Sequence, residues 1–123
     1  MSAAVEFQLP STVLTVLQLL RERDANMSVV AAVAFAFICE NEGLSQTELC
    51  QLLDEPSYVV SRVVDYLGQG TAQVGREARQ RGLDLVERVP WDRDRRVRVL
   101  KLTPSGQRLR QALNAAVVRP QPL

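Results

Sequence analysis

Four residues in the middle of the chain could bind the edges of nucleic-acid bases. A helix would place Ser57, Tyr58, Ser61 and Arg62 on one side, because their spacing follows the helical repeat. A guanidinium group can donate two hydrogen bonds to one guanine, and hydroxyl groups can bind bases or phosphates. The alternative is a solvated helix face on which Arg62 pairs with Asp65. The other interpretation is that this face enters the major groove of DNA, and the four residues by themselves leave both interpretations open.

A second group places three arginines around one carboxylate. It consists of Arg93, Asp94, Arg95 and Arg96. Such arginines bind phosphates and are attracted to narrow A·T-rich minor grooves. Because phosphate repels a carboxylate, we expect Asp94 to orient an arginine by a paired hydrogen bond. The alternative is an internally neutralised tip, since Asp92 and Asp94 cancel part of the charge; here we favour DNA.

The sequence shows no pattern typical of catalysis or of metal binding. It has no histidine, no glycine-rich phosphate loop and no nucleophile beside a recognisable base. Cys39 and Cys50 fit no metal-ligand spacing and lie in apolar helical patterns, which favours reduced core thiols. A redox-sensing cysteine would need exposure and a lowered pKa, which these neighbours do not suggest. We therefore expect neither an enzyme nor a bound cofactor or metal.

Charge is distributed unevenly along the 123 residues, a length typical of one domain. Residues 1–75 hold three basic and nine acidic side chains, whereas residues 76–110 hold eleven basic and five acidic ones. This asymmetry points to a polyanion bound by one region of the fold. The longest apolar run, residues 29–39, is shorter than the roughly 20 residues of a membrane span. No signal peptide is visible, and we expect a cytoplasmic protein without a membrane partner.

A helix-turn-helix is expected around the first polar group. Ser45 and Glu48 form the pattern of a capping box, and the helix they begin should end near Asp54. Pro56 favours the start of a second helix. The buried stripe of that helix repeats at i, i+3, i+4, i+7 and consists of Val60, Val63, Val64 and Leu67. Two short helices joined in this way are typical of DNA-binding proteins.

Further helices are expected on both sides. The first begins at Pro10, and its apolar positions are Val13, Val16, Leu17 and Leu20. Because it is apolar around most of its circumference, we expect these residues to contact a second chain as well as the core. Ser28 can cap the next helix, which should run to Glu40. Thr103 and Pro104 can begin the last one.

Two β-prone runs, residues 83–89 and 96–102, predict a hairpin. Its tip, residues 90–95, is expected to be longer than a two-residue turn. Trp91 is expected to anchor the base of the hairpin against the core. Residues 69–81 predict a loop with one helical turn over residues 76–81.

Several stretches resemble the MarR family of bacterial transcription regulators. Residues 94–106 match the wing pattern D-x-R-x5-L-T-x-x-G of that family. Residues 44–49 (LSQTEL) resemble the start of the first helix of its helix-turn-helix, and residues 60–67 (VSRVVDYL) resemble its recognition helix. The resemblance, which includes the first wing strand at residues 85–88, covers about residues 28–113. It implies a homodimer that binds double-stranded DNA.

Two departures from the family pattern bear on the dimer and on the wing. Residues 68–84 separate the recognition helix from the wing, whereas family members usually need only a few residues there. The last helix should end near Val118, whereas relatives carry longer dimerisation helices. We therefore expect a dimer either to depend on the first helix or to have a smaller interface than usual.

These observations predict a mainly α (α+β) winged helix-turn-helix with a two-stranded β-wing and flanking N- and C-terminal helices. In a single domain, residues 1–25 form the N-terminal helix, residues 26–102 the core with an insertion at 68–82, and residues 103–118 the C-terminal helix. The predicted function is a homodimeric, sequence-specific transcription regulator, most simply a repressor, on a near-palindromic operator; the sequence names no small-molecule effector. One alternative is a protein–protein interaction module or accessory factor of a mobile element. Sequence-tolerant DNA packaging is another, and the modest net charge disfavours it.

Overall fold

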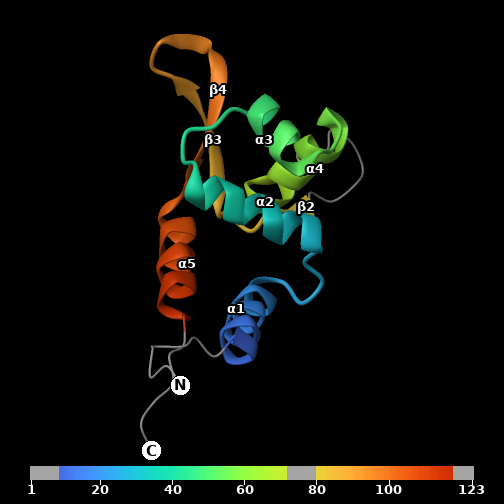
Figure 1. Cartoon of the computed structure of the whole chain (residues 1–123). Helices are drawn as coiled ribbons and strands as arrows, with labels where there is room; N and C mark the ends of the chain where they lie inside the picture. The colour runs from blue at the N-terminus through green and yellow to red at the C-terminus, as the bar shows by residue number, and fades with distance from the viewer. Residues whose placement is uncertain (1–8, 72–79, 118–123) are drawn as a thin grey trace, which may run out of the picture.

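The computed structural model describes residues 9–71 and 80–117, which form helices and two small antiparallel hairpins (Figure 1). The elements, in chain order, are α1 (Leu9–Arg23), α2 (Val29–Glu40), α3 (Gln46–Leu53), α4 (Ser57–Leu67), β1 (Gly70–Thr71), β2 (Gln80–Arg81), β3 (Val86–Trp91), β4 (Asp94–Leu102) and α5 (Pro104–Ala115). The predicted winged helix-turn-helix with flanking helices is confirmed.

Helices α2, α3 and α5 begin where the sequence places capping residues. Ser28 Oγ accepts from the Ala31 amide at 3.1 Å. The capping box of α3 is complete: Ser45 Oγ accepts from the Glu48 amide at 3.1 Å, and the Ser45 amide donates to Glu48 Oε1 at 2.8 Å. Thr103 Oγ1 accepts from the Gly106 amide at 3.0 Å. These bonds satisfy amides that the first turn of a helix leaves unpaired.

The core lies between α2, α4 and the inner face of the β3–β4 hairpin. On α2, Phe35 and Ile38 are fully buried. The buried stripe of α4 includes Val60 and Val64, and Leu100 of β4 packs into the same cluster. Burial of apolar area is the main stabilising contribution in such a core, and it fixes which side of α4 faces outward.

The β3–β4 hairpin, which we call the wing, differs at its tip from the expectation. Trp91 pairs with Asp94, so the connection is a two-residue turn at Asp92 and Arg93, and the register shifts between Pro90 and Trp91. Both strands are therefore longer at the tip than predicted. Trp91 lies at this tip with 41% of its surface exposed, so it does not anchor the base of the wing against the core.

The base of the wing is attached to the segment before α3. The Gly43 amide donates to the Leu100 carbonyl at 2.8 Å, and the Leu100 amide donates to the Leu44 carbonyl at 2.9 Å. Ser45 adds a bridge to Val99. The capping residue of α3 is thereby held against the strand that carries the wing.

The insertion between α4 and the wing forms a second hairpin, in which Gly70 pairs with Arg81. Residues 80–81 are a strand, so the predicted helical turn over residues 76–81 is wrong there; its remaining residues lie outside the described part of the chain. Gly82 has no room for a side chain, because a Cβ would stand 2.0 Å from the Gly68 carbonyl oxygen and 2.4 Å from the Gly70 nitrogen. This close approach returns the chain to the C-terminal end of α4.

Helix α1 lies at the opposite end of the molecule from the wing tip and packs beside α5 (Figure 1). Arg23 Nη1 donates to Ser105 Oγ at 2.9 Å, and the Tyr66 hydroxyl donates to Asp24 Oδ2 at 2.5 Å. Leu20 is buried in the core of its own chain, so it is not part of the open face for which it was predicted. None of the described helices is long and apolar enough to cross a membrane.

Candidate nucleic-acid interface

The outward face of α4 carries the four residues predicted to enter a groove of DNA. Ser57, Tyr58 and Arg62 are exposed, and Ser61 is half-buried. Tyr58 has 66% of its surface exposed, whereas Val60, about half a turn further around the axis, is fully buried. The packing of α4 therefore leaves a rigid polar face with a phenol, hydroxyls and a guanidinium group open to a ligand.

Arg62 is available to an external partner. It forms no ion pair with any acidic side chain of the described residues, and Asp65, its expected alternative partner, binds Arg88 instead. The alternative of an Arg62–Asp65 pair is therefore not found.

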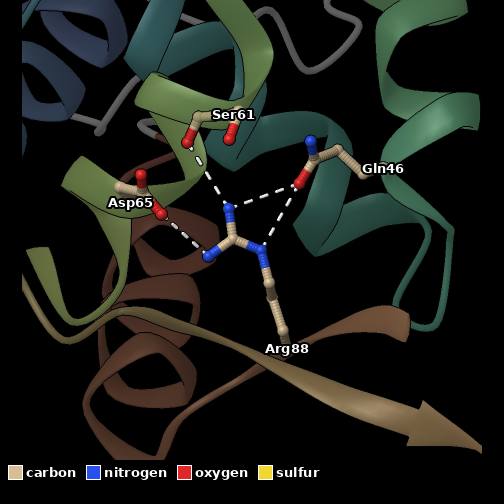
Figure 2. A network of polar contacts seen from close by, with 4 residues as sticks. All are labelled: Gln46, Ser61, Asp65 and Arg88. Atoms are coloured by element: carbon tan, nitrogen blue, oxygen red, sulfur yellow. Dashed lines mark hydrogen bonds and ion pairs between the residues drawn. The ribbon is translucent and has the colours of Figure 1, made fainter. Parts of the chain in front are cut away.

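Arg88 joins the wing to both helices of the helix-turn-helix (Figure 2). It extends from β3, and its Nη1 donates to Asp65 Oδ1 of α4 at 2.9 Å. Its Nη2 donates to the Ser61 carbonyl oxygen at 3.4 Å and to Gln46 Oε1 of α3 at 3.3 Å. One planar guanidinium group thus connects three elements, which a flexible ammonium group could not do with the same geometry.

This network was missing from the predictions made from sequence. The signal available was alternation in β3, where Arg88 shares a side with the fully buried Val86. An arginine at a core-facing position requires acceptors from whatever packs over it. Asp65, about one turn after Ser61 on α4, and Gln46, the first residue of α3, provide them.

At the tip of the wing, Asp94 holds Arg96. Arg96 Nε donates to Asp94 Oδ1 at 3.1 Å, Nη2 donates to Oδ2 at 3.3 Å, and the Arg96 amide donates to Oδ1 at 3.0 Å. These bonds, led by those of the side chain, hold the pKa of Asp94 below its ordinary value. The prediction that Asp94 orients an arginine is confirmed.

Arg93 and Arg95 also lie at the tip, and both are exposed. No acidic side chain of residues 9–71 or 80–117 forms an ion pair with either of them. Within the described residues, internal neutralisation of the tip therefore involves Arg96 alone. The guanidinium groups of Arg93 and Arg95 remain open to a ligand.

The thiol of Cys39 is poorly suited to redox sensing. Burial raises its pKa to about 11, although nearby Arg110 acts in the opposite direction. A thiol with such a pKa stays protonated near neutral pH, and the thiolate is the reactive species. Among the described residues, no three His, Cys, Asp or Glu side chains gather as a metal site would require.

Comparison with known proteins identifies the architecture. No protein-family model and no curated protein matches the sequence. Among solved structures, the S. aureus MepR–DNA complex matches at a TM-score of 0.63 and 18% identity, over 89% of this chain and 75% of that one. RV1404 from Mycobacterium tuberculosis matches at 0.64 and 18%, over 85% and 63%. The PcaV transcriptional regulator from Streptomyces coelicolor, in complex with its natural ligand, matches at 0.53 and 20%, over 73% and 55%.

These structures are those of MarR-family regulators. The chain has the MarR-type winged-helix fold. In this fold α4 occupies the place of the recognition helix and β3–β4 that of the wing, as the sequence motifs predicted. The β1–β2 hairpin is the insertion that the sequence placed between the two.

Proposed function

We propose that this chain is a sequence-specific, double-stranded DNA-binding transcription regulator that acts as a homodimeric repressor on a near-palindromic operator. The observation that carries the proposal is the placement of the two predicted DNA-binding groups. The polar face of α4 and the arginine-bearing wing lie at the same end of the molecule, joined by Arg88 (Figures 1 and 2). A duplex can meet both together, with α4 in the major groove and the wing over an adjacent minor groove.

The chemistry of these surfaces favours DNA over a protein partner. A helix that binds another protein through its outward face would present leucine or methionine, whereas α4 presents hydroxyls and Arg62. The wing adds exposed arginines, which are typical of phosphate contacts. The structural neighbours include a DNA complex of MepR and the transcriptional regulator PcaV, which supports the same assignment.

The homodimer is proposed to use the open apolar face of α1. Val13 and Leu17, which were predicted for this role, are 52% and 56% exposed, and Leu9 and Leu14 extend the same helix surface. Val16 is half-buried and borders this face. Four large apolar side chains exposed on one short helix form a patch that association would cover. A two-fold dimer would then place two copies of α4 about 34 Å apart, one turn of DNA.

The test is selection of binding sites from random duplexes, followed by footprinting and sedimentation on the selected site. We expect a near-palindromic site whose half-sites are one helical turn apart, bound by two chains. Selection that enriches no sequence would contradict the proposal and favour a protein-interaction module. A soluble monomer at micromolar concentration would contradict the dimer and the two-fold operator together. Repression is tested separately, by placing the selected site across a promoter.

A further inference from the structure

A polar pocket lies at the base of the wing, away from the residues already assigned to DNA. Its volume is about 300 Å³, and its walls come from the C-terminal end of α4, from β1 and from the wing. Its polar lining residues include Gln69, Arg88 and Arg98.

Arg88 and Arg98 lie on the same face of the wing. In the register, Arg88 is opposite Leu100 and Arg98 is opposite Pro90. Since alternate residues of a strand share a face, Arg98 lies on the side of buried Leu100 and of Arg88, the side that faces the helices. The two arginines therefore stand one above the other along the wing, with Arg98 nearer the tip.

The two guanidinium groups differ in what binds them. The charge of Arg88 is compensated by Asp65 at 2.9 Å. Arg98 is exposed, and within the described residues it forms no ion pair and no side-chain hydrogen bond. The pocket therefore holds one open cation, and its lining also includes the exposed residue Gln69.

We propose that Arg98, assisted by Gln69, binds one phosphate of the DNA backbone at the base of the wing. This assignment rests on the proposed function. When a recognition helix and a wing occupy neighbouring grooves, the phosphate strand between those grooves must cross the junction of the two elements. The pocket lies between these two elements, since Val64 on the buried side of α4 and both wing strands line it, and Arg98 is its exposed arginine on the side nearer the tip. A charge-assisted hydrogen bond from arginine to phosphate is the contact that such a crossing requires.

The experiment is a salt titration of binding to the selected site and to an unrelated duplex, with Arg98→Ala, Arg98→Lys and a control. The control is Lys101→Ala, which removes the same charge from the same strand but from the opposite face. In a dimer, Arg98→Ala should lower the slope of log affinity against log salt by about 1.8, or about 0.9 per contact. It should weaken both duplexes by the same factor, roughly tenfold for each contact, because a phosphate contact carries no sequence information.

Arg98→Lys should keep most of the slope, and Lys101→Ala should bind as the wild type does. An unchanged slope in Arg98→Ala, while the wild type binds DNA, would overturn this inference and leave the proposed function intact. An equal loss in Lys101→Ala would also overturn it, since net charge would then explain both results. A wild type that binds neither duplex would overturn the proposed function, and this inference with it.

Discussion

Two surfaces at the same end of the molecule differ in how their side chains are held. The outward face of α4 is backed by fully buried valines, so Arg62 projects from a rigid, well-packed helix. The tip of the wing projects beyond the helices. Arg93 lies in its two-residue turn and Arg95 lies where the register of the two strands shifts, so neither is backed by the core. Discrimination between bases requires donors at fixed positions, whereas attraction to phosphates requires only charge within reach. We infer that α4 reads the sequence and that the wing tip holds the duplex.

The largest loss of DNA affinity is expected from substitutions at the tip of the wing. Replacement of Arg95 and Arg96 by alanine should weaken binding to the selected site and to unrelated DNA alike. In a dimer up to four phosphate contacts would be lost, so the slope of log affinity against log salt should fall by as much as about 3.6. Salt titrations on two duplexes measure this. A loss of affinity confined to the selected site would show that the tip recognises bases. The proposed difference in role between the tip and α4 would then be wrong.

The next effect is expected from α4. Arg62→Ala should weaken binding to the selected site by about 1–3 kcal/mol and relax the preference at one base pair in each half-site. Because Arg62 makes no ion pair among the described side chains, its removal should leave the free energy of unfolding nearly unchanged. Binding to a panel of single-base variants of the site is the measurement. Equal weakening on all duplexes would make Arg62 a phosphate contact.

A smaller effect is expected from the network that joins the two surfaces. The Arg88 and Asp65 side chains are each about one-third exposed, at 33% and 32%. A double-mutant cycle on the free energy of unfolding should therefore give an interaction energy of about 0.5–1 kcal/mol between them. Arg88→Ala should weaken DNA binding without a change in the salt slope, because this arginine positions the wing and does not bind phosphate. Asp65→Ala in the Arg88→Ala background should add no further loss of binding. A further loss would mean that Asp65 acts independently of the wing.

The sequence predicted those parts of the molecule that depend on local chemistry. Caps at Ser28, Ser45 and Thr103 are short-range hydrogen bonds, and the apolar stripe of α4 follows from the helical repeat. Both can therefore be recognised from a short segment of the sequence. The bond between Asp94 and Arg96 is equally local. For the same reason, the open polar face of α4 was predicted from sequence.

What sequence reasoning missed depends on contacts between distant segments. Arg88 binds residues 23 and 42 positions away in the chain, and no local pattern records such partners. Leu20 follows the same periodicity as Val13 and Leu17, but only the packing of α1 against the core distinguishes the buried residue from the exposed ones. Trp91 was expected at the base of the wing because an aromatic side chain usually anchors a hairpin to the core, whereas its pairing with Asp94 leaves it at the exposed tip. The β1–β2 hairpin was missed because it depends on how closely Gly82 approaches Gly68 and Gly70.

Asp94→Ala should change DNA affinity the least of these substitutions, but the direction of the change is the most informative. Asp94→Ala removes a negative charge from a surface that should face phosphates, so a model based on charge alone expects tighter DNA binding. The structure leads to the opposite expectation. Asp94 receives two side-chain hydrogen bonds from Arg96, whose side chain is 91% exposed and has no other ion pair among the described residues. Without this carboxylate, Arg96 must lose its rotamer freedom when it binds DNA, and the contact weakens.

Asp92→Ala provides the matched control for this prediction. Asp92 is exposed on the same turn and carries the same charge, but within the described residues it makes no side-chain hydrogen bond or ion pair with an arginine. Asp92→Ala should therefore bind DNA as well as the wild type or more tightly, whereas Asp94→Ala should bind several-fold more weakly on both duplexes, since rotamer ordering costs about 0.5–1.5 kcal/mol per side chain. If both variants bind more tightly, the charge of the tip matters and its geometry does not. Weaker binding by Asp94→Ala alone would mean that the wing, too, depends on a side chain held in a fixed position. On the wing this is Arg96 alone, whereas on α4 it is the whole outward face.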